Sequence, residues 1–452
     1  MNDGVRQLYE TRTYPPMSHP LADPAVSTVA AWIGGLDAKP PGHTRVLEIG
    51  CSSGLNLIPL AMRWPDSRFT GIDLAQPAID TARELVGIAG LRNIEFLRQD
   101  LREFDAPPES FDIIIAHGFF SWVPDEVKSA LFAFCRKHLA PSGFATISFN
   151  LSCGWSHRFP VIEKVRAIQQ AGDADVIEAL HVLREVIPDE SEEIAIIDDM
   201  LAKGPDILAF DDFGPVNDPW PLDRFIAAAE EAGLSWVGES DPGHNFPRGL
   251  DAETVAKLRA EHPDPLALQC AADEAARRTF RSGVLCLNDA PRMPGIHPKR
   301  LLELPVRIRN QSAPDTIQQA IEKVDPNLLS CFSISELRNF SPILDERIWM
   351  QDLWRGLLNG GLELRTDGLR LDAEAPEHPR LNAFRLACVR RGMPVVDAWH
   401  RPCRFPTMHE KIVSAMDGTN DLDTLRAMAR ADAPDLAFDP WIRHLAGRGF
   451  FL

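Results

Sequence analysis

The first 150 residues alternate short apolar segments with amphipathic ones, and this alternation constrains the fold more than any other feature of the chain. The apolar segments have the length of buried strands, and the segments between them repeat apolar residues with helical spacing. Such an alternation predicts an α/β fold with a mostly parallel sheet and helices on both faces. We expect strands at residues 45–49, 68–73, 93–97, 111–116 and 144–149, and helices at residues 57–63, 77–86 and 124–139.

A glycine-containing turn follows the first expected strand, within the segment 46–56 (VLEIGCSSGLN). Glycine has no side chain and tolerates positive φ, so Gly50 and Gly54 would let a ligand approach the backbone. Their spacing differs from the GxGxxG loop that places a pyrophosphate on a helix N-terminus. Glu48, on the preceding strand, would repel a pyrophosphate but could bind an ammonium group. The segment therefore favours a ligand that carries an ammonium group.

Two more carboxylates follow the second and third expected strands. Asp73 comes 19 residues after Gly54, where a carboxylate can accept from both hydroxyls of a ribose. Asp100 could accept from the amino group of an adenine. A plain strand–helix turn is the alternative interpretation, but carboxylates at three successive strand ends disfavour it. A ligand with an ammonium group, a ribose and an adenine but no phosphate is S-adenosylmethionine. The expected cofactor-binding residues are Glu48, Gly50, Cys51, Gly54, Asn56, Asp73, Leu74, Asp100 and Leu101.

These residues resemble the motifs of class I S-adenosylmethionine-dependent methyltransferases, whose fold is Rossmann-like. The resemblance covers about the first 150 residues. It implies that the segment 48–54 is the first motif, that Asp73 is the ribose-binding acid and that Asp100 lies on the adenine side. The chain departs from the family at Ser52, where many members have glycine, and serine fits there if its φ is not strongly positive.

A narrower resemblance covers most of the chain. The segment 117–124 (HGFFSWVP) is similar to the HGVxSWVP segment of bacterial methyltransferases that carry a methyltransferase regulatory domain. Members of that group include protein-lysine methyltransferases that act on outer-membrane proteins. The family often has tyrosines where this chain has Phe120, Phe149 and Ser152, and phenylalanine cannot hydrogen-bond an amine as a phenol does. Further matches lie at residues 16–20, 149–150, 154–155, 211–213, 217–219, 280–281, 285–286 and 417–419.

Methyl transfer from a sulfonium requires a nucleophile held in line with the methyl group, and a base only if that nucleophile is protonated. His117 follows the fourth expected strand and is the candidate catalytic residue. It could accept a proton, line the site, or serve only as a turn residue. Tyr14 could close over the cofactor as a lid or pack on the surface. The candidate acceptor-binding residues are Phe120, Trp122, Asn150 and Trp155, of which Trp155 could instead belong to the core.

The chain is long enough for about three domains. Residues 1–172 are expected to form the methyltransferase domain with an N-terminal lid segment. Residues 173–297 are expected to form a mainly helical regulatory or substrate domain, and residues 298–452 a mixed α+β region that resembles a winged helix only loosely. We expect helices at residues 221–233, 253–260 and 265–278, strands at residues 306–308 and 362–364, and two short helices within residues 408–436.

The chain carries 47 basic and 65 acidic residues, a formal net charge of −18. Such a surface repels phosphate backbones, so a nucleic-acid partner is not expected. Fifteen acidic and two basic residues lie between 173 and 223; they are solvated helix faces or a guide for a basic substrate. The eight cysteines form no CxxC pair, so reduced thiols are expected and a metal site is not. Without a secretory segment or a membrane-length apolar run, we expect a cytoplasmic protein.

The sequence thus predicts a methyltransferase that transfers a methyl group to a protein side chain, with a lysine-type nitrogen as the first candidate. The acidic stretch at residues 173–223 would attract a lysine-rich target. The first alternative is a small-molecule acceptor beneath a lid and dimerisation region, which the phenylalanines at 119 and 120 favour, and a homodimer is among the expectations. The second alternative is a non-catalytic protein that retains the cofactor pocket.

Overall fold

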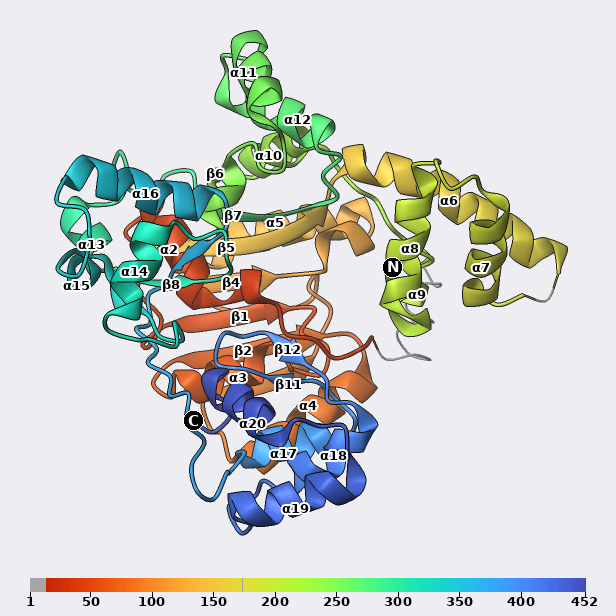
Figure 1. Ribbon diagram of the computed structural model, residues 1–452. Coiled ribbons are helices and arrows are strands. Elements are labelled where there is room, and N and C mark those ends of the chain that lie inside the picture. The colour runs from red at the N-terminus through yellow and green to blue at the C-terminus, as the bar shows by residue number, and fades with distance from the viewer. Residues whose placement is uncertain (1–13, 173) are drawn as a thin grey trace.

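The computed structural model describes residues 14–172 and 174–452. Its centre is a seven-stranded sheet with the strand order β3-β2-β1-β4-β5-β7-β6 (Figure 1). β1 to β5 run parallel, and β7 pairs antiparallel with both β5 and β6. The predicted α/β class with a mostly parallel sheet is therefore confirmed. The strands are β1 (Arg45–Ile49), β2 (Arg68–Asp73), β3 (Ile94–Arg98), β4 (Phe111–Ala116), β5 (Leu139–Asn150), β6 (Leu234–Glu239) and β7 (Phe280–Leu287).

The register of the central strands places the candidate carboxylates at one edge of the sheet. β1 lies between β2 and β4, and Glu48 is opposite Gly71 of β2 and Ile115 of β4. Asp73 is opposite Arg98 at the end of β3. Since parallel strands end at the same edge, the turns after β1, β2 and β3 converge there.

Helices flank this sheet, and their sequences explain their limits. Asp23 caps α2 by accepting from the Ala25 backbone N–H at 2.9 Å, which satisfies one donor of the first turn. Gly90 ends α4 with φ 68°, a conformation that glycine adopts without strain. The flanking helices are α2 (Pro24–Ile33), α3 (Leu57–Arg63), α4 (Gln76–Ala89), α5 (Asp125–His138) and α10 (Leu222–Glu231).

The sheet continues past residue 172, where the sequence predicted a second domain to begin. β6 and β7 lie within the segment predicted to be a helical domain, and their pairing with β5 makes them part of the central sheet. Only the inserted helices are separate. Helices α6 to α9 project to the right of the sheet in Figure 1 and have a hydrophobic cluster of their own. The insertions are α6 (Ser152–Ala171), α7 (Val176–Val186), α8 (Glu193–Lys203), α9 (Pro205–Asp211), α11 (Ala252–Glu261) and α12 (Pro265–Ala275).

The C-terminal third forms two groups, which contact helices that flank the central sheet, α2 and α4. The first is a three-stranded sheet of the order β10-β8-β9 with helices around it. It comprises α13 (Pro298–Glu303), β8 (Pro305–Ile308), α14 (Asp315–Glu322), β9 (Phe332–Ser333), α15 (Ile334–Arg338), α16 (Glu346–Leu358) and β10 (Leu362–Leu364). The second lies beside α4 in Figure 1 and comprises α17 (Ala383–Arg390), β11 (Val395–Val396), β12 (Pro402–Cys403), α18 (Thr407–Ser414), α19 (Leu422–Asp432) and α20 (Phe438–Gly447).

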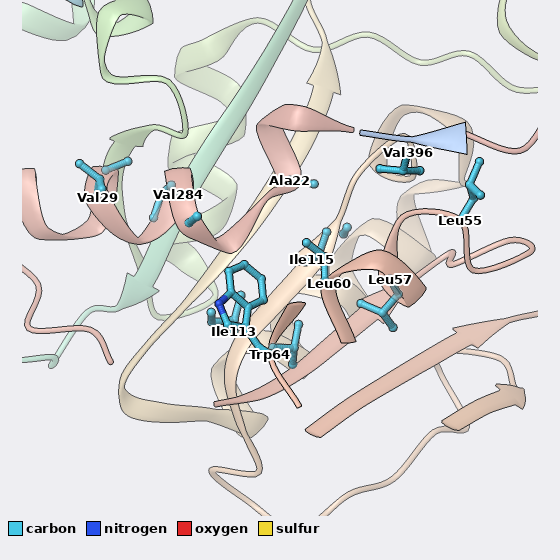
Figure 2. Packing of buried hydrophobic residues seen from close by; sticks show 14 of the residues in the cluster. Ala22, Val29, Leu55, Leu57, Leu60, Trp64, Ile113, Ile115, Val284 and Val396 are labelled. Carbon is cyan, nitrogen blue, oxygen red and sulfur yellow. The ribbon is translucent and has the colours of Figure 1, made fainter. Parts of the chain in front are cut away.

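One hydrophobic cluster runs through the central sheet and both C-terminal groups. Figure 2 shows side chains from this cluster, among them Ile113 of β4, Val284 of β7 and Val396 of β11. Because all three belong to the same cluster, residues 298–452 do not form a core apart from the central sheet. None of the helices in the described ranges is long and apolar enough to span a bilayer.

Candidate cofactor and acceptor site

A cavity of about 580 Å³ lies at the carboxyl ends of the parallel strands. The turns after β1 to β4 form its floor. The segment before α2 and the end of α9 also contribute side chains. All but one of the nine expected cofactor-binding residues line the cavity: Glu48, Gly50, Cys51, Asn56, Asp73, Leu74, Asp100 and Leu101.

Glu48 lines this cavity and has one carboxylate oxygen without a hydrogen-bond partner among the described residues. Its side chain is 3% exposed. Its Oε1 accepts a hydrogen bond from Asn56 Nδ2 at 2.7 Å, whereas Oε2 has no hydrogen-bond partner among the described residues. Burial raises the pKa of Glu48 to about 8, because the ionised form has lost its solvation. A buried carboxylate with a vacant oxygen is suited to an ammonium ligand, which would supply the missing charge and donor.

Asp73 is held in place by the turn that follows β1. Its Oδ2 accepts from the Ser52 backbone N–H at 2.8 Å, and its Oδ1 accepts from the Ala75 backbone N–H at 2.9 Å. Each carboxylate oxygen has a second lone pair, so Asp73 retains the capacity to accept from two ribose hydroxyls. Ser52 adopts φ 45°, the left-handed region that favours glycine. Serine is thus accommodated at a strongly positive φ, and its N–H bond to Asp73 offsets part of that strain.

Asp100 lies in the cavity wall with its carboxylate already engaged. Arg102 donates hydrogen bonds to this carboxylate from Nε at 3.1 Å and from Nη2 at 2.7 Å. The backbone N–H of Arg102 donates a third hydrogen bond at 2.9 Å. These bonds, the side-chain ones first, hold the pKa of Asp100 below its ordinary value. An adenine amino group would share this carboxylate with Arg102.

Gly54 is the expected cofactor residue that does not line the cavity. Its φ is 75°, and a Cβ at this position would lie 2.5 Å from the ring of Phe96 on β3. Gly54 therefore acts on the site indirectly, because the absence of a side chain lets the turn after β1 pack against β3.

His117 follows β4, lines the cavity and is partly exposed. Its ring stacks on that of His19, with centroids 4.1 Å apart. Its Nδ1 is buried and makes no hydrogen bond to a described residue. Burial, with His19 and His400 nearby, lowers the pKa of His117 well below its ordinary value. The imidazole is therefore neutral at physiological pH and a weak proton acceptor.

Of the four expected acceptor-binding residues, only Trp122 lines the cavity. Phe120 is fully buried in an aromatic cluster with Phe132, Phe149, Trp220 and Phe225. Its place there explains why an apolar ring occupies the position.

Asn150 and Trp155 also lie outside the cavity, behind the residues that line it. Asn150 Nδ2 donates to Asn217 Oδ1 at 3.1 Å. Trp155 packs in the helical cluster of α6 to α9, and its ring meets Trp122 edge-on at 6.2 Å. These side chains therefore support the wall rather than form it.

The cavity includes residues that the cofactor motifs did not identify. Tyr14, Met17 and His19 reach it from the segment before α2, and Phe210 and Asp211 reach it from α9. The His19 segment and the 211–213 segment were noted as family matches, but the sequence offered no sign that they meet. Only the fold brings the two segments together, across 197 positions of sequence between Tyr14 and Asp211.

Asp211 is the acidic residue that α9 contributes to this group. Tyr14 Oη donates to its Oδ1 at 3.3 Å, and no ion pair to Asp211 is formed within the described parts of the chain. The adjacent Asp212, by contrast, pairs with Arg158 at 2.7 Å and with Lys203 at 2.9 Å. Burial raises the pKa of Asp211 to about 6. Its side chain is therefore a cavity carboxylate still able to receive a cation.

Two family models match the chain. The first, described as "Methyltransferase domain", covers residues 46–143. The second, described as "Predicted methyltransferase regulatory domain", covers residues 204–286. The second model thus includes Asp211, the strand β6 and all of β7 except its last residue.

Known proteins resemble the chain over different lengths. An uncharacterised Rickettsia prowazekii protein is 28% identical over 296 residues, which are 62% of this chain and 53% of that protein. This chain thus spans about half of that relative's length. A phosphatidylethanolamine N-methyltransferase from Cereibacter sphaeroides is 36% identical over 141 residues, 27% of this chain and 68% of that enzyme.

The fold is also that of PKMT2 from Rickettsia typhi. The superposition has a TM-score of 0.80 and covers 96% of this chain and 97% of that chain at 19% identity. A second structure of PKMT2, in complex with AdoHcy, gives a TM-score of 0.76 over 94% of this chain and 92% of that chain. At this level of identity the likeness concerns the fold.

Proposed function

Because the chain belongs to the S-adenosylmethionine-dependent methyltransferases and carries a match to their regulatory domain, we propose that it methylates an amine of a protein side chain, with a lysine-type nitrogen as the acceptor. The polar groups that line the cavity are suited to the methyl donor, S-adenosylmethionine. The unpartnered Oε2 of Glu48 supports its role as the acceptor for the ammonium group of the donor, and Asp73 has lone pairs for the ribose. We propose these two residues as its principal polar partners, with Gly50, Cys51, Asn56, Leu74, Asp100 and Leu101 around them.

The observation that carries the amine proposal is Asp211. It is a carboxylate without an ion pair among the described residues, in the same cavity as Glu48. One cavity with two such carboxylates suits two cationic partners, the ammonium of the donor and the ammonium of an acceptor. Tyr14, which donates to Asp211, would fix the direction from which an amine enters.

The chemistry asks little of the protein beyond positioning and the exclusion of water. S-adenosylmethionine supplies a sulfonium methyl group as the electrophile. The acceptor amine must first lose a proton, and its lone pair then forms the N–C bond while the C–S bond breaks and leaves its electron pair on sulfur. Asp211 would hold the ammonium form and take up its proton for release to solvent, since its pKa of about 6 keeps it largely ionised at pH 7. His117 would line the site as a neutral imidazole.

One observation favours a small-molecule acceptor as the second candidate. The Tyr14–Asp211 hydrogen bond joins the segment before α2 to α9 across the cavity, and an arrangement closed in this way suits a compact substrate. A protein side chain would enter only after this contact opened. The two candidates therefore differ in whether the contact must break.

Incubation of the protein with S-adenosylmethionine carrying a labelled methyl group and a cell lysate separates these candidates. Label in protein bands, released as methylated lysine after hydrolysis, is the expected result. Label only in small metabolites would replace the proposal with the second candidate. Measurable donor affinity without any transfer would oppose both.

The Asp211→Asn variant tests the residue that carries the proposal. We expect the KM for the acceptor to rise at least about tenfold, as for a lost charge-assisted hydrogen bond of about 1.5–3 kcal/mol. Calorimetry should find the affinity for S-adenosylmethionine unchanged, because the donor contacts lie at the strand ends. Asp206→Asn is the matched control, since Asp206 is exposed on the same helix. Equal KM values for both variants would remove Asp211 from acceptor binding.

A further inference from the structure

The loop between β11 and β12 brings a buried histidine to the cofactor site from the far end of the chain. His400 is 0% exposed, and its Nε2 lies 2.7 Å from Oδ1 of Asn56, which is 344 positions earlier in the sequence. Asn56 in turn donates from Nδ2 to Glu48 Oε1 at 2.7 Å. A continuous chain of two hydrogen bonds therefore links the C-terminal region to Glu48, the carboxylate proposed above to bind the donor's ammonium group.

The partners of Asn56 fix which way its amide points. The His19 backbone N–H donates to Asn56 Oδ1 at 2.9 Å, so this atom is the amide oxygen and His400 must be its second donor. The His400 proton is then on Nε2, which leaves Nδ1 without a partner among the described residues. With its oxygen held by two donors, Asn56 turns its NH₂ group toward Oε1 of Glu48. Oε2 is then the oxygen left for a ligand.

The loop that carries His400 is built to hold this residue in a strained conformation. His400 has φ 63°, which is unfavourable for a residue with a Cβ. Asp397 supports the turn by accepting from the backbone N–H groups of Trp399 at 2.9 Å and Arg401 at 2.8 Å. Ser18 Oγ donates to the His400 carbonyl at 3.0 Å. Contacts from both ends of the chain therefore converge on a residue that a relaxed turn would not place here.

From this geometry we propose that His400 is a positioning residue for the methyl donor. Through Asn56 it orients Glu48, so that the affinity for S-adenosylmethionine depends on the docking of the loop at residues 397–401. The C-terminal region thus completes the cofactor site without touching the donor. This role is independent of which acceptor is methylated.

The dependence must also run in the opposite direction, because coupling between two equilibria is reciprocal. Donor binding, which engages Glu48, should strengthen the docking of the His400 loop. In hydrogen exchange, the backbone amides of Trp399 and Arg401 should become better protected when S-adenosylhomocysteine is added. Protection unchanged by the ligand would contradict the coupling.

Calorimetry of S-adenosylhomocysteine binding to the full chain tests the role of the imidazole. His400→Gly relieves the positive φ but removes the donor to Asn56, and the Kd is expected to rise about tenfold, the effect of one lost hydrogen bond of about 1.4 kcal/mol. His400→Gln keeps an N–H close to the place of Nε2 and should retain most of the affinity. His378→Gly, at an exposed position of the C-terminal region, is the control and should bind as the parent chain does. If the glycine variant fails to fold, His400→Asn takes its place, because asparagine tolerates positive φ but is too short to reach Asn56.

A double-mutant cycle separates positioning from a merely structural role. If His400 acts through Asn56, the combination of His400→Gly with Asn56→Ala should bind no more weakly than Asn56→Ala alone. The KM for the acceptor, measured at saturating donor, should stay unchanged in the His400 variants. A Kd unaffected in His400→Gly, or losses that add in the double variant, would overturn the proposal.

Discussion

Glu48 illustrates at the scale of a single residue how a binding site is prepared at a cost in stability. Its carboxylate is buried with one oxygen unpartnered, and its pKa is raised to about 8 by that burial. In the unfolded chain this group titrates near 4.5. Because the folded value is the higher one, the folded protein loses stability as pH rises from about 4.5 to about 8. An ammonium ligand would reverse this effect by pairing with the ionised form.

We therefore predict that binding of S-adenosylmethionine releases a proton from Glu48 near pH 7. Affinity should increase with pH between about 6 and 8, since the neutral carboxyl must ionise to pair with the ammonium group. Calorimetry in buffers of different ionisation enthalpy measures the proton directly. In the Glu48→Gln variant the release and the pH slope should both vanish, and binding should weaken.

The same variant should be more stable than the parent chain when no cofactor is present, most clearly above pH 8. The neutral amide has no ionised form to desolvate. Thermal unfolding at pH 6 and pH 9 checks this expectation. A parent chain and a variant with equal pH slopes in both binding and stability would show that Glu48 does not titrate as its burial indicates.

At the scale of secondary-structure elements, glycine positions show where two elements must approach closely. Gly154 lies in the first turn of α6, and a Cβ there would meet the backbone oxygens of Arg278 and Arg277 at 2.5 and 2.7 Å. Gly87 lies in α4 with no atom within 4 Å of such a Cβ. Both glycines are helical, so they differ in packing rather than in backbone conformation.

The two alanine substitutions should therefore have opposite effects. We predict that Gly154→Ala lowers the free energy of unfolding by about 1–3 kcal/mol, because backbone atoms of the segment before β7 cannot move aside cheaply. Gly87→Ala should raise it by about 0.5–1 kcal/mol through helix propensity alone. Urea denaturation of the two variants provides the measurement. A stabilised Gly154→Ala variant would mean that α6 does not pack on this segment as described.

Elements also mark where sequence patterns succeeded and failed. Strands β1, β2 and β4 have the predicted limits, because each carries buried apolar residues and is bounded by turn residues. β6 and β7 were not predicted. β7 begins with Phe280, Arg281 and Ser282. Arg281 is buried, and ion pairs with Asp273 and Glu239 compensate its charge. A charged residue in a buried strand breaks the apolar pattern, and only its partners on other elements explain it.

For the whole molecule, buried charges connect the C-terminal region to the catalytic sheet. Arg365 is 1% exposed. It pairs with Asp23 at the start of α2 at 2.7 Å and with Asp367 at 2.6 Å. Asp23 also pairs with Arg63 at the end of α3. The charges compensate one another across three parts of the chain, so each is stable only while the others stay docked.

Removal of one member should therefore be far more damaging than removal of an exposed ion pair. We predict that Arg365→Met lowers the free energy of unfolding by about 3–5 kcal/mol, because it leaves Asp23 buried with reduced compensation. Arg277→Met, which removes an exposed pair with Glu192, is the control and should change stability little, since water screens such pairs. Thermal or urea unfolding distinguishes the two. Similar losses of unfolding free energy in both variants would show that Arg365 does not compensate the buried charge of Asp23.

The sequence alone determined which residues line the cavity at the strand ends. Strand ends in a parallel sheet meet at one edge, so the local order of strand, turn and acidic residue was enough to bring Glu48 and Asp73 into one cavity. Tertiary structure alone decided the rest. Asp211, Tyr14 and His400 reach the site from segments far apart in the chain, and the candidate residues Phe120, Asn150 and Trp155 were drawn into packing behind its wall. Contacts between distant segments follow from how whole elements dock, and no periodicity within a single segment records them.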